Sequence, residues 1–165
     1  GPQFTHVAGY HAGIVIRQAM FGLRARCDLR ALPAVTFADP EVAQAGLTEA
    51  EARGRDANVT VLTAMIADTD RAVAERRREG LVKLVFSRRK RLIGATIVAA
   101  GAGEMIGLCT LAIQQGASIA TLAQLIAPYP TLAEAVKRAA GSYYTPRLFA
   151  PGPRRFVRLV QSLLP

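Results

Sequence analysis

Hydrophobic and polar positions along the chain divide it into an opening helix, a strand-rich middle and a helical second half. Apolar residues recur at near-helical spacing from Val7 to Leu23, which predicts a helix with Thr5 as its N-cap. In the middle, β-branched and aliphatic residues alternate with others over short runs, a pattern typical of strands. These runs cover residues 32–37, 59–67, 81–86 and 92–98. We expect them to form an antiparallel sheet of about four strands.

Turn and cap residues separate these runs. Asp39-Pro40 ends the first run, because proline restricts the residue before it and interrupts regular pairing. Thr48 and Glu51 fit a capping box, which predicts a short helix that ends near Gly54. The polar stretch 87–91 joins the last two runs and predicts a hairpin.

The second half of the chain predicts helices. Residues 104–115 are apolar on nearly every face, so a helix here is buried on both sides or packs against a partner subunit. Ser118 can cap a short helix, and Thr131 with Glu134 fits a second capping box that opens a helix through Ala140. Because strands come first and helices later, we expect an α+β fold with helices packed on one face of the sheet.

The C-terminal stretch predicts one more helix. From Arg154 to Leu164, apolar residues alternate with arginines at a spacing that gives an amphipathic helix with a basic edge. We expect this helix to pack on its own dimer. Attachment to an anionic membrane surface is the alternative.

Composition places the chain among soluble globular domains. It has 165 residues, enough for one domain with its own core, and 51% of them are hydrophobic. Lysine and arginine number 21 against 12 acidic residues, which gives a net charge of +9. Basic clusters at 76–78, at 88–91 and at Arg154-Arg155 with Arg158 raise nucleic acid or an anionic membrane as a partner, but no aromatic platform, helix-turn-helix or zinc finger accompanies them. We therefore expect solvated turns and no nucleic-acid partner.

Candidate chemistry within the chain is sparse. Cys27 and Cys109 are too far apart for a CxxC pair, a zinc ligand set or a disulfide framework, so we expect no metal site. The turn at Gly101-Ala102-Gly103 lacks the third glycine of a dinucleotide-binding motif and favours a plain tight turn. The N-terminus has no signal-peptide pattern, so we expect a cytoplasmic protein. A helix this close to the first residue is typical of a fragment of a longer chain.

Four stretches in a fixed order resemble one known family. They are Phe4-Thr5-His6-Val7-Ala8, residues 35–49, residues 94–98 leading into 102–106, and Pro128-Tyr129-Pro130-Thr131-Leu132-Ala133-Glu134. Together they are similar to the C-terminal dimerisation domain of the pyridine nucleotide-disulfide oxidoreductases. That family includes glutathione reductase, dihydrolipoamide dehydrogenase and mercuric reductase. The resemblance covers the chain from about residue 4 to about residue 145.

The resemblance implies a piece of a larger enzyme. In the family this domain follows an FAD-binding and an NAD(P)H-binding domain, so the implied full-length parent is a homodimer that uses FAD and NAD(P)H. Residues 1–30 would be the terminal helix of the FAD-binding domain and a linker, 31–146 the dimerisation domain, and 147–165 a basic amphipathic tail. The chain alone would be inactive. The alternative is a free-standing dimerisation or interaction module without a redox role.

The resemblance also implies site residues. In the family, a His-Pro-Thr motif followed by a glutamate completes the partner subunit's active site: the histidine is the acid/base for the dithiol and the glutamate orients it. Here the matching catalytic residues are Tyr129, in place of the histidine, and Glu134. A phenol with a pKa of about 10 stays protonated near pH 7, so it is a poor proton shuttle for thiols. The matching cofactor contacts are Thr5, His6, Val7, Tyr129 and Pro130.

In carrying tyrosine at this position, the chain resembles mercuric reductase and its relatives. The resemblance therefore implies a mercuric-reductase-like oxidoreductase rather than a glutathione or lipoamide reductase. True mercuric reductases tend to end in a vicinal cysteine pair, whereas this chain ends Gln161-Ser162-Leu163-Leu164-Pro165. That departure leaves the substrate open.

Overall fold

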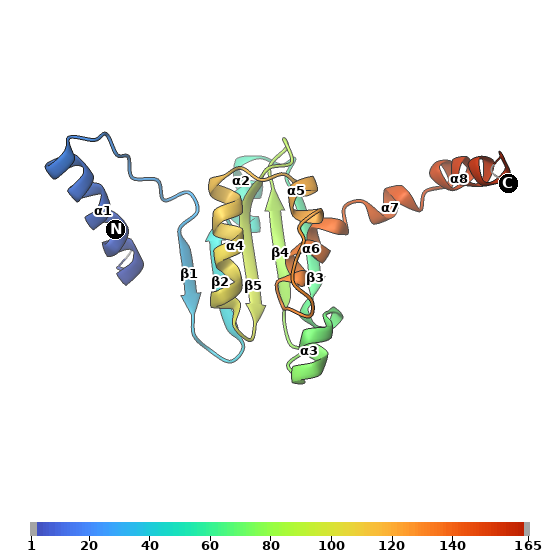
Figure 1. Cartoon of the computed structure of the whole chain (residues 1–165), viewed down its shortest axis with the longest axis horizontal. Coiled ribbons are helices and arrows are strands. Elements are labelled where there is room, and N and C mark those ends of the chain that lie inside the picture. Colours follow the sequence, from blue (N-terminus) through green and yellow to red (C-terminus); the bar gives the residue numbers. More distant parts are fainter. Residues whose placement is uncertain (1–2, 164–165) are drawn as a thin grey trace.

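A five-stranded antiparallel sheet forms the centre of the molecule (Figure 1). The computed structural model describes residues 3–163, and within that range only the backbone of residues 154, 156, 159, 162 and 163. The order across the sheet is β1-β2-β5-β4-β3, and every neighbouring pair is antiparallel. The strands are β1 (Pro33–Thr36), β2 (Glu41–Gly46), β3 (Thr60–Met65), β4 (Leu81–Phe86) and β5 (Leu92–Ala99).

The sequence pattern does not predict β2, which the structure adds as the fifth strand. Its residues include a single β-branched side chain, so the pattern that marks the other strands is weak here. Asp39-Pro40 ends β1 as predicted, but the chain then reverses, and β2 pairs with both β1 and β5. Ala43 and Ala45 are fully buried where β2 packs against the helix Ala102–Gln114. Small side chains therefore let this helix lie close to the sheet.

Helices cover one face of the sheet, which confirms the α+β prediction (Figure 1). Helix α4 packs across β2 and β5, and α6 packs across β3 and β4. The helices are α1 (Thr5–Phe21), α2 (Glu49–Arg55), α3 (Asp70–Glu75), α4 (Ala102–Gln114), α5 (Ile119–Ala123), α6 (Glu134–Gly141), α7 (Thr145–Leu148) and α8 (Pro151–Leu163), with a 3-10 turn at Ile66–Asp68.

The hydrophobic core lies between the sheet and helices α4 and α6. Alternate residues of β4 and β5 are fully buried there, among them Leu84, Phe86 and Ile97. Cys109 of α4 joins this core, and burial raises the pKa of its thiol to about 12. Cys109 is therefore a packing residue and not a nucleophile near pH 7.

One chain buries only one side of α4. Met105, Cys109 and Ala112 face the core, whereas Leu111 on the other side is 56% exposed. The sequence predicts either burial on both sides or packing against a partner subunit. Burial on both sides within one chain is therefore wrong, and packing of α4 against a partner subunit stays a prediction.

The predicted helix caps are confirmed in part. Thr48 and Glu51 form both bonds of the capping box at α2, and the Ser118 hydroxyl accepts a backbone hydrogen bond in the first turn of α5. The prediction for Thr5 is wrong. Phe4 is the N-cap of α1, because its backbone is extended, whereas Thr5 is already the first helical residue.

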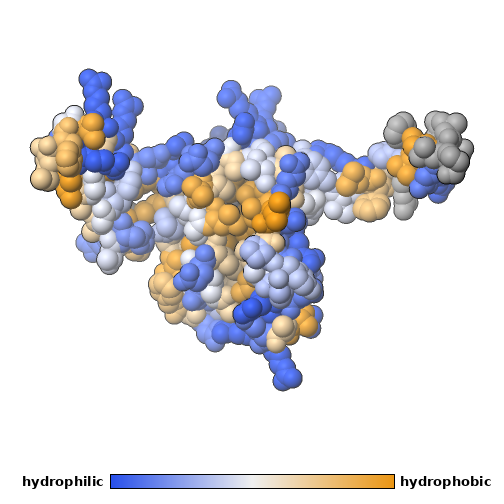
Figure 2. Space-filling model, viewed as in Figure 1, coloured by the Kyte–Doolittle hydropathy of each residue, from blue (hydrophilic) through white to orange (hydrophobic). Residues whose placement is uncertain are grey.

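The tail extends from the body as α7 and α8 (Figure 1). The helix predicted from Arg154 begins earlier, at Pro151. Of its predicted apolar positions, the side chains of 156, 159 and 163, and all of Leu164, lie outside the described residues. Figure 2 shows apolar and polar residues side by side on this arm. Among residues 3–163, none of the helices combines the length and apolar character that crossing a bilayer requires.

Candidate functional site

Tyr129 projects from the loop between α5 and α6 and binds a carboxylate on another element. Its side chain is 70% exposed, and its hydroxyl donates a hydrogen bond of 2.6 Å to Oδ2 of Asp70. Asp70 is the first residue of α3. The contact joins residues 59 positions apart in sequence. It fixes one end of an otherwise exposed tyrosine side chain.

Hydrogen bonds of Thr69 fix the start of α3. Thr69 precedes Asp70 and is fully buried. Its hydroxyl donates to the carbonyl of Ile66 at 2.8 Å and accepts from the backbone N–H of Ala72 at 3.4 Å. This N-cap fixes the backbone at Asp70, and it thereby positions the carboxylate that accepts the hydrogen bond from Tyr129.

Acidic groups around Tyr129 keep its phenol protonated. The hydrogen bond to Asp70, and then the negative charge of that carboxylate, raise the pKa of Tyr129 above its ordinary value. Glu134 raises the pKa further, while Arg138 lowers it. At pH 7 the phenol is therefore a hydrogen-bond donor and not a proton shuttle.

Glu134 holds the loop that follows Tyr129. Its Oε2 accepts from the backbone N–H of Thr131 at 3.3 Å. The predicted capping box is only half formed, because the Thr131 hydroxyl donates to the carbonyl of Pro128 at 2.7 Å, and Ala133 is the N-cap of α6. Beside this loop lies an open groove of about 440 Å³. It is lined by Arg71, Glu75, Ala100, Gly101, Glu104, Met105 and residues 130–133.

The residues matched to flavin contacts form the first turn of α1. Val7 is buried, whereas Thr5 and His6 are exposed. The His6 ring stacks on Phe4, and its Nε2 lies 3.0 Å from the carbonyl of Pro33. His6 and Val7 line an open cavity of about 180 Å³ together with Tyr10, Asp28, Leu29, Ala31, Leu32, Pro33 and Gln114.

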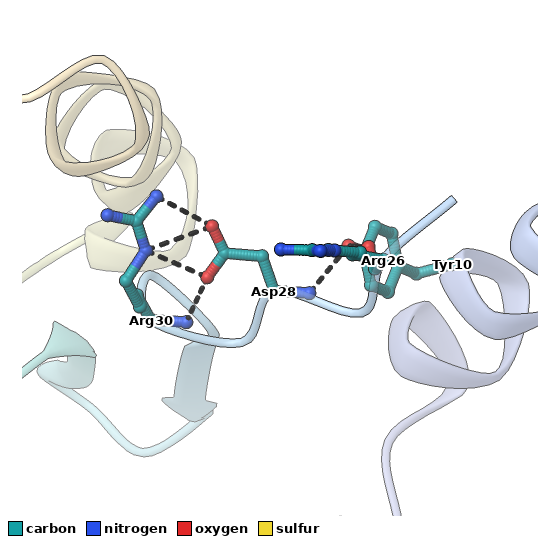
Figure 3. Close-up of polar contacts among 4 residues, drawn as sticks. All are labelled: Tyr10, Arg26, Asp28 and Arg30. Atoms are coloured by element: carbon teal, nitrogen blue, oxygen red, sulfur yellow. Dashed lines mark hydrogen bonds and ion pairs between the residues drawn. The ribbon is translucent and has the colours of Figure 1, made fainter. Parts of the chain in front are cut away.

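The linker after α1 folds back onto that helix (Figure 3). The Tyr10 hydroxyl accepts from the backbone N–H of Asp28 at 3.0 Å and donates to the carbonyl of Arg26 at 3.3 Å. Arg30 pairs with the Asp28 carboxylate at 2.7 Å, which lowers the pKa of that carboxyl. These contacts position the wall of the cavity beside His6.

The two groups of predicted site residues do not meet within one chain. Helix α1 lies beyond the β1 edge of the sheet, and α3, which binds Tyr129, lies near its other edge (Figure 1). The sequence does not reveal the role of Asp70, because nothing in the residues around it points to a partner so distant along the chain. Within the described part of the chain, no cluster of three or more His, Cys, Asp or Glu residues is arranged to hold a metal ion.

This sheet with helices on one face is a fold also found in flavoprotein disulfide reductases. Residues 32–140 match the family described as pyridine nucleotide-disulphide oxidoreductase, dimerisation domain, and the chain belongs to that family.

Proteins of known identity agree with this assignment. The chain is 40% identical to mercuric reductase of Staphylococcus aureus over 85% of its length and 26% of the relative's. It is 36% identical to dihydrolipoyl dehydrogenase of Vibrio cholerae, over 84% of this chain and 29% of that protein. Its fold matches the HOCl-induced flavoprotein disulfide reductase RclA of Escherichia coli with a TM-score of 0.79 and 26% identity, covering 86% of this chain and 33% of RclA. The chain thus spans about a quarter to a third of these proteins.

Asp70 should control the titration of Tyr129. We expect Asp70→Asn to lower the pKa of Tyr129 toward the ordinary value of about 10, because the variant removes the negative charge that disfavours phenolate. The measurement is a spectrophotometric pH titration of tyrosinate, in which the curve of Tyr129→Phe is subtracted to isolate Tyr129. The matched control is Asp68→Asn, an exposed acid in the same segment. An equal shift in both variants would contradict the assigned contact.

Proposed function

We propose that the chain is the C-terminal part of an FAD-dependent NAD(P)H oxidoreductase of the mercuric-reductase-like type, acting as a homodimer in the cytoplasm. In this assignment residues 1–30 end the FAD-binding domain, 31–146 form the dimerisation domain and 147–165 are an added tail. The exposed apolar residues Val15, Ile16, Met20 and Phe21 of α1 support the first boundary, since a helix with such a surface fits a neighbouring domain.

The observation that carries the proposal is the separation of Tyr129 from the first turn of α1. Tyr129 is exposed and held by Asp70, whereas Thr5, His6 and Val7 lie on α1, beyond the other edge of the sheet. A site that needs both groups is complete only when Tyr129 of one subunit faces the flavin of the other. The chain by itself is then inactive.

The first turn of α1 fits one edge of a flavin and not a whole cofactor. Its helix N-terminus carries partial positive charge, which favours the negative charge of a reduced flavin. The cavity of about 180 Å³ beside His6 is smaller than the roughly 300–1,000 Å³ of typical ligand pockets, so this chain supplies one wall. FAD, bound mainly by the preceding domain, supplies the electron transfer from NAD(P)H. Tyr129 and Pro130 approach it from the partner.

Tyr129 stabilises charge in this proposal and does not carry protons. A phenol that stays protonated donates a hydrogen bond to a thiolate, a flavin or a bound metal adduct. Glu134 keeps the Tyr129 loop in position through the Thr131 backbone. We therefore expect the full-length enzyme to be a weak disulfide reductase. Assays with NADH and NADPH against disulfides, mercuric ion, quinones and oxygen test this; turnover of glutathione disulfide or lipoamide typical of histidine enzymes would refute it.

The dimer can be tested on the chain itself. We expect it to sediment as a dimer, and Leu111→Asp to raise the dimer dissociation constant about tenfold or more, because a charge would enter an apolar interface. Sedimentation equilibrium over a range of concentrations gives both constants. Val15→Asp is the matched control, since it places the same charge at an exposed apolar site on α1. A monomeric chain at every concentration would overturn dimerisation by this domain alone.

A further inference from the structure

The C-terminal arm combines exposed apolar residues with unopposed positive charge. Residues 145–165 include four basic residues and no acidic one. The basic residues are Arg147, Arg154, Arg155 and Arg158. Leu148, Phe149, Val157 and Val160 in α7, α8 and the turn between them are exposed apolar residues.

Helix α8 separates these two kinds of residue. At 3.6 residues per turn, positions 154, 155 and 158 fall on one side of the helix, together with Gln161 and Ser162. Positions 156, 157, 159, 160 and 163 fall on the opposite side, and every one of them is apolar. The sequence of α8 is therefore amphipathic from Arg154 to Leu163, with arginine as its only charged residue type.

Helix α8 lies apart from the body of the chain. In Figure 1 it lies beyond α7, away from the sheet and from α4 and α6. The family match ends at residue 140, so α7 and α8 lie beyond the matched residues. The sequence alone favours a tail packed on its own dimer. The arginines of this tail favour the alternative, because residues 145–165 hold no acidic side chain to pair with them and anionic headgroups would supply the opposite charge.

We infer that α8 docks on an anionic membrane surface, lying in the plane of the lipid headgroups. With 13 residues it is too short to span a bilayer, but it suits interfacial binding, in which apolar side chains enter the headgroup boundary and arginines stay at the phosphates. Nucleic acid would use the arginines alone and leave the apolar side without a partner. This inference does not depend on the proposed redox role, because α8 lies outside the dimerisation domain.

The test is co-sedimentation of the full chain with lipid vesicles. We expect binding to vesicles of phosphatidylcholine mixed with phosphatidylglycerol, and little binding to phosphatidylcholine alone. Arg155→Glu/Arg158→Glu should weaken partitioning more than about tenfold, since each basic residue near an anionic surface contributes several-fold. Val157→Asp/Val160→Asp should weaken it to a similar extent.

The matched control reverses the same charge elsewhere. Arg88→Glu/Arg89→Glu changes two exposed arginines in the β4–β5 hairpin and should leave partitioning within about twofold. Equal loss in the hairpin variant would show a general charge effect and overturn the inference. So would failure to bind the mixed vesicles at low salt, tighter binding to a short DNA duplex that ignores the valine changes, or self-association abolished by those changes.

Discussion

Replacing Phe86 by alanine is expected to lower the free energy of unfolding by about 3–5 kcal/mol, the largest stability effect that we predict for one side chain. Phe86 is 0% exposed at the end of β4 and packs in the core between the sheet and its helices. Alanine would leave a cavity there, because the strand pairs on both sides hold the backbone in place. Urea unfolding measures the difference, and the thermal midpoint should fall by roughly 10 °C.

Phe37→Ala is the matched control for this prediction. It deletes the same atoms from a side chain that is 81% exposed, so we expect a change within about 0.5 kcal/mol. Two variants of equal stability would contradict the assignment of Phe86 to the core. A change in the slope of the urea transition would indicate an altered denatured state and call for the thermal measurement instead.

Removing the Tyr129 hydroxyl is expected to have the largest effect on activity. In the full-length enzyme, Tyr129→Phe should lower kcat/KM for the substrate by about 10- to 100-fold, because a hydrogen bond to a charged group contributes roughly 1.5–3 kcal/mol. The expectation rests on the proposed function, in which the phenol donates to a charge formed during the reaction. Because the side chain is exposed, the variant should fold as the parent does.

Two further variants separate a role in the reaction from a role in structure. Tyr143→Phe deletes the same hydroxyl from another tyrosine and should leave kcat/KM within about twofold. Asp70→Asn keeps the phenol but loses its charged acceptor, so we expect a smaller fall in activity than in Tyr129→Phe. Full activity of Tyr129→Phe with every substrate would rule out the assigned role.

Local sequence patterns predicted most elements of this fold. The strands at 81–86 and 92–98 follow from alternating β-branched residues, and the helix at 49–55 follows from the Thr48 and Glu51 capping box. In each case the signal lies within a few neighbouring residues. The strand Glu41–Gly46 was not predicted, because its small buried alanines fit the packing of α4 and do not form a strand pattern. That packing joins segments about 60 residues apart.

The candidate site was predicted to a lesser extent. The resemblance to a known family led to Tyr129, Glu134 and the first turn of α1, whereas Asp70 appears only once α3 and the Tyr129 loop are seen together. The tertiary structure also shows that the capping box predicted at Thr131 is only half formed. The carbonyl of Pro128 competes for the threonine hydroxyl, and sequence spacing does not reveal that competitor.

The sequence by itself determined the family, the α+β class, the periodic elements and the amphipathic character of the tail, because each depends on residue order over short distances. Only the tertiary structure decided which faces stay open: the Leu111 side of α4, the tyrosine held by Asp70, and α8 lying apart from the body. Exposure and long-range hydrogen bonds depend on contacts between segments that are distant in sequence, and local periodicity does not determine those contacts.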